Sequence, residues 1–174
     1  SRHASLIDIY LDATAVGSTT TGAGILLSTL PTSAFSGGLE IRSCYAIQFK
    51  YGVKMVGIDL DNTWTTVSMY NTWLQGNSAG IVSGSCGVYM DANTNGIGTC
   101  FYGGDIESFD TGVYVAEGSF GGIFELDFEG NVNNFSVGTT FAGRIVPASG
   151  LPFRSKTSNA SGSGLPWQQS AIPL

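Results

Sequence analysis

Two adjacent segments of the chain read as two copies of one unit. The first, GVYMDANTNGIGTCFYGGDIESF, covers residues 87–109, and the second, GVYVAEGSFGGIFELDFEGNVNNF, covers residues 112–135. Both open with Gly-Val-Tyr and an apolar residue, the openings lie 25 residues apart (112 − 87), and an aromatic residue, Tyr102 or Phe128, follows the central glycines. A repeat of about 20–30 residues made of short strands and glycine turns is typical of a β-solenoid, in which each repeat forms one coil.

The composition also favours an all-β protein. Glycine accounts for 25 of 174 residues, and charged residues for only 11%. Val, Ile, Thr, Phe and Tyr are plentiful, whereas no long stretch repeats with the helical period of 3.6 residues. We therefore predict a right-handed parallel β-helix with irregular coils of about 21–32 residues, as expected of a solenoid. A β-sandwich such as a jelly roll is the alternative fold.

Weaker copies of the repeat extend toward the N-terminus. Aligning them gives steps of 21, 32 and 26 residues and predicts one ladder of inward side chains: Val53, Leu74, Ile106 and Val132. Because side chains alternate faces along a strand, the flanking residues should form two outer columns. These columns are Gly52, Trp73, Asp105 and Asn131, and Lys54, Gln75, Glu107 and Asn133. The long step implies an insertion, placed at residues 76–86, although GIVSG at 80–84 also fits a strand.

A second family of strands opens the repeats. It comprises residues 57–60, 87–90 and 112–115. We predict that its inward residues are Ile58, Val88 and Val113, with Leu60, Met90 and Val115, and that its outward residues are Asp59, Tyr89 and Tyr114. The first strand, SLIDIYLDATAV, alternates cleanly, so Ile7, Ile9 and Leu11 should share its buried face.

The chain divides into coils at 1–150 and an extended tail at 151–174. The tail is rich in Gly, Ser and Pro and contains three of the five prolines, yet it keeps apolar residues that include Phe153 and Trp167. We expect the tail to dock on another subunit or across an end of the solenoid, where open strand edges need a cap.

The charge balance excludes several functions. The formal net charge is −6 with only 7 Lys and Arg residues, so nucleic-acid binding is not expected, because phosphate contacts need positive charge.

No apolar run reaches the ~20 residues of a membrane helix, and no signal peptide is recognisable. The chain starts with Ser1, which suggests a fragment or processed product. Cys44, Cys86 and Cys100 are expected to be buried free thiols, and His3 alone cannot build a histidine triad or zinc site.

Carboxylates are the main catalytic groups available. Asp105 and Glu107 lie two residues apart on one strand, so both should face outward about 7 Å apart at ~3.4 Å per residue. That separation suits the acid and base of an inverting glycosidase, although solvated outer positions of a strand are the simpler interpretation. Glu125, Asp127 and Glu129 form a further acidic outer row.

Aromatic and amide side chains complete a candidate sugar-binding surface. Sugar rings stack on aromatic rings, and their hydroxyl groups bond to amides and carboxylates. The predicted substrate-binding residues are Trp73, Gln75, Asn131, Asn133, Tyr89 and Tyr114. No metal or cofactor is expected: the Asp59–Asn62 stretch and the DANTNG stretch at 91–96 lack the distal Glu of a calcium loop, so turns are preferred.

Irregular coils, aromatic-rich strands and low charge over residues 5–145 make the chain resemble the tailspike and capsule-depolymerase proteins of bacteriophages. The resemblance implies a homotrimer, in a virion or outside the cell, that binds and in some members cleaves bacterial surface polysaccharide. No diagnostic motif matches, so no catalytic residue is carried over from that family. The enzyme alternative is a glycoside hydrolase or polysaccharide lyase, and the other is a non-catalytic structural or receptor-binding fibre module.

Overall fold

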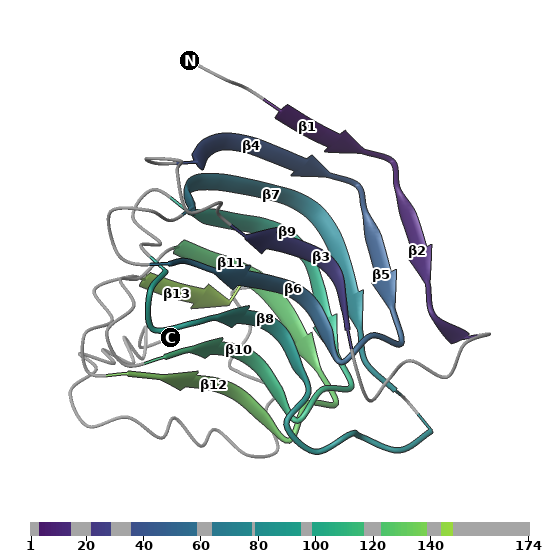
Figure 1. The fold of residues 1–174 in the computed structure, drawn as a ribbon. Coiled ribbons are helices and arrows are strands. Elements are labelled where there is room, and N and C mark those ends of the chain that lie inside the picture. The colour runs from purple at the N-terminus through teal and green to yellow at the C-terminus, as the bar shows by residue number, and fades with distance from the viewer. Residues whose placement is uncertain are drawn as a thin grey trace, which may run out of the picture.

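The computed structural model describes residues 4–14, 22–28, 36–58, 64–77, 79–94, 99–116, 123–138 and 144–147. Strands of two sheets follow one another along the chain, and every described strand pair is parallel (Figure 1). Each coil therefore stacks on the previous one, as in a parallel β-helix. This arrangement confirms the predicted solenoid and excludes the β-sandwich alternative.

The eight-stranded sheet contains β1 (Ala4–Ile7), β2 (Tyr10–Asp12), β4 (Ser36–Arg42), β5 (Tyr45–Ile47), β7 (Trp64–Gln75), β9 (Cys100–Glu107), β11 (Ile123–Glu129) and β13 (Arg144–Pro147). The five-stranded sheet contains β3 (Ala23–Ser28), β6 (Tyr51–Val56), β8 (Cys86–Met90), β10 (Thr111–Val115) and β12 (Asn133–Val137). The strands are short, so each coil depends on its neighbours to bury its apolar side chains.

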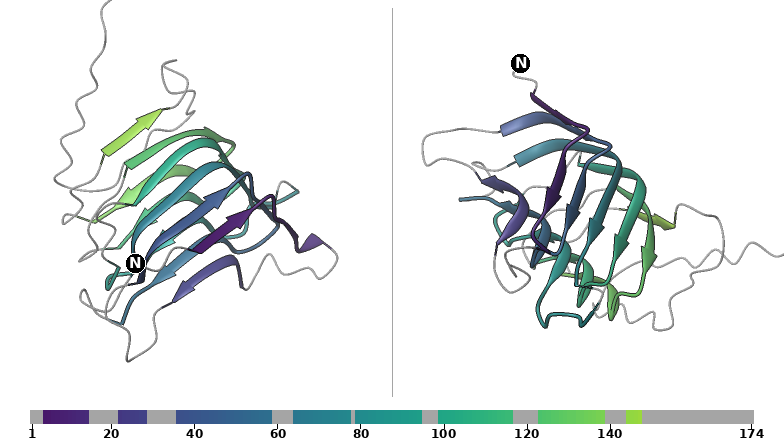
Figure 2. Two further views of the ribbon diagram at one scale, coloured as in Figure 1. Left: turned by 90° about the horizontal axis from the view of Figure 1, so that it is seen from above. Right: turned by 90° about the vertical axis from the view of Figure 1, so that its right-hand side faces the viewer.

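A sharp bend gives each coil three sides (Figures 1 and 2). The first side consists of β1, β4, β13 and the first halves of β7, β9 and β11. The second side consists of β2, β5 and the last residues of β7, β9 and β11. The third side is the five-stranded sheet. The bend follows residues with positive φ: Asp8, Ser43, Asn71, Gly103 and Gly104. Residues with side chains rarely adopt that backbone region, apart from Asn and Asp, so its recurrence at the bend shows that the bend is a regular part of the coil.

Apolar ladders fill the interior. On the second side, successive coils stack Ala46, Leu74, Ile106 and Phe128, and all four are buried. On the third side, the stacked residues are Ile25, Val53, Val88, Val113 and Phe135. Leu74, Ile106, Val88 and Val113 are therefore inward as predicted. Val53 is also buried, but it belongs to the third side and not to the ladder of Leu74.

Three inward assignments were wrong. Val132 is 47% exposed, because Phe128 and not Val132 stacks on Ile106. Ile58 is exposed because the third-side strand of its coil is Tyr51–Val56, so Ile58 lies beyond the end of that strand. Ile7 is exposed because the bend at Asp8 interrupts the alternation, and Leu6 packs on the core instead. Leu60 and Asp59 lie outside the described residues.

The predicted insertion is present. Residues 76–85 connect β7 to β8, whereas only 108–110 and 130–132 make the same connection in the next two coils. GIVSG at 80–84 is therefore part of a loop and not a strand. The insertion explains only part of the predicted step of 32 residues from Leu74 to Ile106. The loop that precedes β9 is also longer than the loop that precedes β11.

The glycine that opens each repeat is the second residue of a third-side strand and lies at a tight corner of the coil. A Cβ at Gly87 would lie 2.7 Å from the carbonyl oxygen of Gly112 and against the side chain of Ile106. The same position is Gly24, Gly52 and Gly112 in other coils, and each faces backbone or core atoms at comparable range. The repeated Gly-Val-Tyr opening therefore reflects the close approach of stacked coils.

We expect Gly87→Ala to destabilise the fold by about 1–3 kcal/mol, because the added methyl group overpacks this corner. Gly80→Ala is the matched control, since a Cβ there meets nothing within 4 Å. Urea denaturation of both variants measures the difference. Equal stability of the two variants would contradict the packing role of the corner glycine.

Cys44 and Cys86 are buried free thiols, as predicted, whereas Cys100 is only half-buried. Burial raises the pKa of the Cys86 thiol to about 12, as expected of an inert buried thiol. Within the described part of the chain, no helix has the length and apolar character needed to cross a membrane. The tail at 151–174 lies outside the described residues, so its docking stays a prediction.

Candidate functional site

Four carboxylates gather on the second side of the helix. Ile106 points into the core, so its neighbours Asp105 and Glu107 both point outward from β9. In the next coil, Asp127 pairs with Asp105, and Glu129 pairs with Glu107. The sequence Asp-Ile-Glu is thus stacked in register on Asp-Phe-Glu, and the acids form two short columns.

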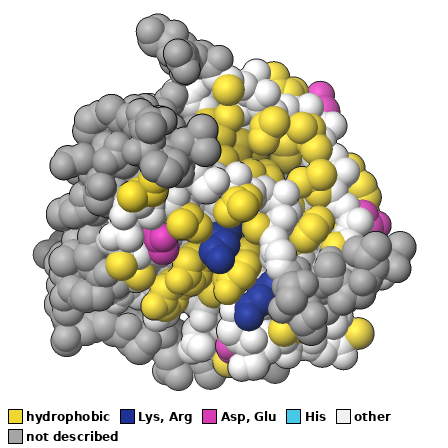
Figure 3. All heavy atoms as spheres, in the orientation of Figure 1, with side chains coloured by type: hydrophobic (Ala, Val, Ile, Leu, Met, Phe, Trp, Pro, Cys, Tyr) yellow, Lys and Arg dark blue, Asp and Glu magenta, His cyan; other side chains and the backbone are white. Residues whose placement is uncertain are grey.

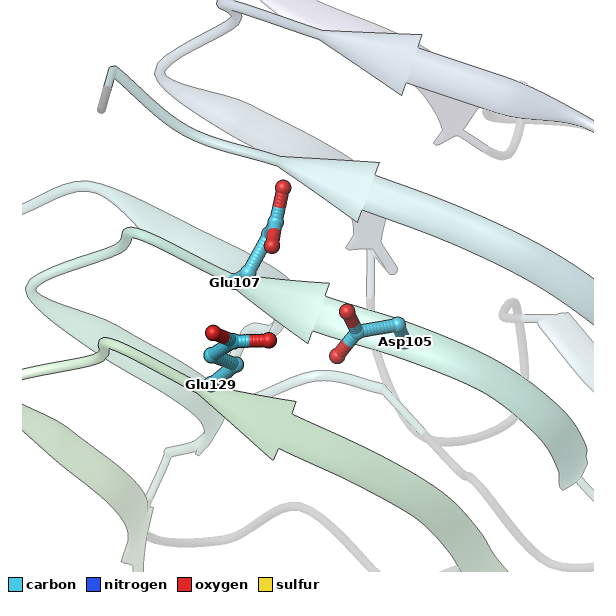
Figure 4. A group of neighbouring side chains, drawn as sticks. All are labelled: Asp105, Glu107 and Glu129. Carbon is cyan, nitrogen blue, oxygen red and sulfur yellow. The ribbon is translucent and has the colours of Figure 1, made fainter.

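Three of these carboxylates lie very close together. One oxygen from each of Asp105, Glu107 and Glu129 lies within 4.8 Å of the other two (Figure 4). Asp105 and Glu129 face one another from neighbouring strands, while Glu107 points toward β7 (Figure 4). The closest approach of Asp105 and Glu107 is therefore shorter than the 7 Å that strand geometry predicted, because the side chains lean toward one another.

Asp105 differs from the other acids in its surroundings. Like Glu107 it is half-buried, but of the four acids only Asp105 has an oxygen, Oδ1, that is shielded from solvent without a hydrogen-bond partner. Burial raises the pKa of Asp105 to about 7, and the negative charges of Glu107, Asp127 and Glu129 add to this effect. Desolvation and like charges both disfavour the ionised form. The cluster therefore keeps a proton on Asp105 close to neutral pH.

Glu107 is held in place from the preceding coil. Gln75 Nε2 donates a hydrogen bond to Glu107 Oε1, and the two residues are register partners on β7 and β9. In the adjacent column, Trp73 pairs with Asp105. The sequence placed Trp73 beside Asp105 and Gln75 beside Glu107, and the strand register confirms both neighbours.

A row of aromatic rings leads along the helix axis to the carboxylates. Tyr10, Tyr45 and Trp73 occupy the same column in three successive coils, and Asp105 follows in the fourth. The ring centroids are 5.9 Å apart for Tyr10 and Tyr45 and 5.6 Å apart for Tyr45 and Trp73. All three rings are exposed, Trp73 by 39%. The second side, which faces the viewer in the right panel of Figure 2, therefore combines stacking surfaces with acids.

Two predicted binding residues lie beyond the acids, Asn131 in the connection after β11 and Asn133 at the start of β12. Asn131 Oδ1 accepts a hydrogen bond from the Phe109 backbone, and its Nδ2 donates one to the Ile106 carbonyl oxygen. Asn133 begins β12 and pairs with Thr111. The predicted register of Asn131 on Asp105 and of Asn133 on Glu107 was wrong, since Asp127 and Glu129 occupy those positions.

Tyr89 and Tyr114 belong to a different surface. Their rings stack on the third side, with centroids 5.1 Å apart. They point outward, as predicted, but they are on the five-stranded sheet and not on the sheet that carries Trp73 and Asp105. The predicted binding residues thus fall on two sides of the helix.

The acidic cluster also has the geometry to hold one cation. Asp105, Glu107 and Glu129 each offer one oxygen, which is the ligand type that Ca²⁺ and Mg²⁺ prefer. The DANTNG stretch is a turn as far as it is described: Asp91 Oδ1 accepts hydrogen bonds from Gly57 N, Asn93 N and Thr94 Oγ1. Asp59 and Asp61 lie outside the described residues.

Comparison with known proteins finds no matching family model, no similar curated protein and no similar solved structure. The site therefore rests on its own geometry. Sequence reasoning missed the stacking of Asp127 and Glu129 on Asp105 and Glu107. The signal that would have found it is the repeated Asp-apolar-Glu triplet at 105–107 and 127–129, 22 residues apart (127 − 105).

The shifted pKa of Asp105 predicts how stability depends on pH. The folded state holds this proton up to about pH 7, whereas the usual carboxyl value is 3.8. Between these values the folded state binds more protons than the unfolded state, so this group makes stability fall as pH rises. We expect Asp105→Asn to raise the melting temperature at pH 8 and to leave it nearly unchanged near pH 4.

The control is Glu125→Gln, which removes a carboxylate of β11 that lies on the first side. Thermal melts of the three proteins across this pH range measure the effect. A gain that is equal at both pH values, or a loss at pH 8, would contradict a strained proton-binding carboxylate at position 105.

Proposed function

We propose that the chain binds a polysaccharide along the second side of its β-helix and hydrolyses a glycosidic bond between Asp105 and Glu107. The observation that carries the proposal is the continuous row from three exposed aromatic rings to a carboxyl group with a pKa near 7. A glycosidase needs a surface on which sugar rings stack and, next to it, a pair of carboxyl groups that act on the glycosidic bond.

The binding step uses the aromatic row. Sugar rings present apolar faces that stack on indole and phenol rings, while their hydroxyl groups bond to amides and acids. The rings of Tyr10, Tyr45 and Trp73 succeed one another from coil to coil, so a glycan chain lying on them runs along the helix axis. Its next sugar then lies over Asp105 and Glu107.

The chemistry divides between two acids with different surroundings. Asp105, protonated near neutral pH, donates its proton to the glycosidic oxygen while the bond from that oxygen to the anomeric carbon breaks. The Glu107 carboxylate, positioned by Gln75, attacks the anomeric carbon and forms a glycosyl ester. A water molecule then gives a proton back to Asp105 and cleaves the ester.

The spacing of the acids favours this retaining reaction. The nearest oxygens of Asp105 and Glu107 lie within 4.8 Å. Retaining pairs are separated by roughly 5–5.5 Å, whereas inverting pairs leave roughly 6.5–9.5 Å for a water molecule. The anomeric configuration of the first product, followed by NMR, tests this point directly.

A non-catalytic receptor-binding module is the second candidate. The aromatic row favours it, because Tyr10, Tyr45 and Trp73 provide a binding surface that does not involve the acids. Either function suits a phage tailspike or tail fibre, the context that the resemblance of the coils suggests. The homotrimer implied by that resemblance is part of the same proposal, and sedimentation of the full chain tests it.

One experiment separates the two candidates. The protein is incubated with a panel of bacterial capsular polysaccharides, with and without EDTA, and new reducing ends and binding are measured. We expect reducing ends from at least one polymer and roughly 2- to 12-fold weaker binding by Trp73→Ala, since one stacked aromatic contributes about 0.5–1.5 kcal/mol. Tyr70→Ala, which removes a stacked ring from the first side, is the control. Binding without reducing ends indicates the receptor-binding module.

A further inference from the structure

We propose that the third side carries a second, separate binding site for an acidic polysaccharide that bears uronate groups. The site consists of Tyr51, Tyr89 and Tyr114 with Lys50 and Lys54. The tyrosines and Lys54 lie on the five-stranded sheet and Lys50 directly precedes it, so none of these residues belongs to the row that ends at Asp105. The inference does not depend on the proposed hydrolysis, which uses the second side.

The three tyrosine rings form a cluster that spans three coils. Their ring centroids are 5.2 Å apart for Tyr51 and Tyr89 and 5.1 Å apart for Tyr89 and Tyr114. All three side chains are half-buried at the outer surface of β6, β8 and β10. Tyr89 and Tyr114 are register partners one coil apart, as the ~4.8 Å spacing of parallel strands predicts, whereas the register partner of Tyr89 on β6 is Lys54 and Tyr51 lies three residues before it.

Two lysine side chains lie over the same rings. The Lys54 ammonium is 4.7 Å from the centroid of Tyr51 and 5.5 Å from that of Tyr89, and the Lys50 ammonium is 5.6 Å from that of Tyr51. Figure 3 shows Lys or Arg side chains on this face, one of them among hydrophobic side chains. Within the described ranges, neither lysine forms an ion pair with a carboxylate.

The nearby acids are already engaged by the backbone. Asp91 Oδ1 accepts hydrogen bonds from Gly57 N and Asn93 N, and Asp110 Oδ2 accepts one from Gly84 N. Two like charges above one tyrosine ring attract an anion, which would bond to both ammonium groups. On a chain with a net charge of −6, this pair of cations is a local exception.

An acidic sugar polymer is the ligand that fits both halves of the surface. A uronate residue combines a ring that stacks on tyrosine with one carboxylate for a lysine. A neutral glycan would leave the ammonium groups without a counter-charge. A nucleic acid would bring a phosphate at every nucleotide to a surface with only two cations on an acidic chain, which electrostatics disfavours.

The test uses oligogalacturonate and alginate oligomers as probes, with methyl-esterified oligogalacturonate as the uncharged match. Binding to the full chain is measured by titration calorimetry at low and high salt. We expect the acidic oligomers to bind at low salt, and Lys54→Gln to weaken them by about tenfold or more. Lys54→Arg should restore binding, and Tyr70→Ala, which removes a stacked ring from the first side, should leave it unchanged.

Four results would overturn the proposal: no binding of either acidic oligomer, equal binding of the esterified oligomer, no effect of Lys54→Gln, or stronger Lys54-dependent binding of single-stranded DNA. A change of oligomeric state in Lys54→Gln, seen by sedimentation, would instead assign this surface to subunit contact. The proposed hydrolysis is tested by a different experiment, the release of reducing ends, which depends on Trp73 and Glu107 of the second side. A negative result there does not change the outcome expected from these titrations.

Discussion

Polysaccharide cleavage should fall at least about 10³-fold when Glu107 is replaced by Gln, whereas binding should stay within about twofold of the wild type. The amide keeps the size of the side chain but cannot attack the anomeric carbon. Gln75 can still bond to the side-chain oxygen of the new residue, so the position of the side chain is preserved. The substrate is the polymer of the panel that yields reducing ends, and the rate of their release is the measurement.

The control variant for this prediction is Glu125→Gln, a carboxylate of β11 on the first side. Glu129→Gln is the informative comparison, because Glu129 belongs to the same group of close oxygens but is exposed and lies one coil further on. Full activity of Glu107→Gln with loss in Glu129→Gln would move the nucleophile to the next coil. Full activity in both variants would remove the acids of this face from the reaction. Loss of wild-type activity in EDTA would assign the cluster to a bound cation instead.

The architecture was predictable because the repeat is visible in the sequence. The Gly-Val-Tyr openings of β8 and β10 stack in register, with Val88 on Val113 and Tyr89 on Tyr114. Short strands that cannot bury their own apolar residues leave stacking as the only stable solution. The inward positions of Leu74 and Ile106 followed from simple alternation, and both are buried.

The register of the last coil was not predictable in the same way. Glu125 pairs with Tyr102, but Asp127 pairs with Asp105, so the register shifts by one residue within β11 and β9. Gly103 and Gly104, both with positive φ, form the bend at this point. A local irregularity of this kind changes the repeat length without changing the strand pattern. This shift of one residue does not explain why 131–133 were aligned with 105–107, since the observed partners, 127–129, lie four residues earlier. The alignment matched Phe128 with Tyr102, whereas Phe128 pairs with Ile106, and this error concealed the four-carboxylate cluster.

The aromatic row was hidden for a related reason. Its members are separated by 35 residues (45 − 10) and then by 28 (73 − 45), because the loops between strands differ in length from coil to coil. Periodicity at a fixed step cannot connect Tyr10 with Tyr45. Only the strand register brings both rings next to Trp73, and with them the direction in which we propose that a glycan lies.

Replacing Ile106 by Ala should destabilise the fold by about 2–5 kcal/mol, the usual cost of removing a large buried aliphatic side chain. Ile106 is only 1% exposed, and it stacks between Leu74 and Phe128 in the interior ladder. The cavity would remain open, because the neighbouring side chains are held by the strands above and below. This cost is a large part of the typical total stability of a domain.

Val132→Ala is the matched control for that prediction. Val132 was expected in the same ladder but is exposed, so its truncation should change stability by no more than about 0.5 kcal/mol. Urea denaturation of both variants, followed by circular dichroism, gives the two values. Equal losses would contradict the observed register of β11 on β9. That register also positions Asp105 and Glu107 on either side of Ile106, so the same comparison tests the support of the proposed catalytic pair.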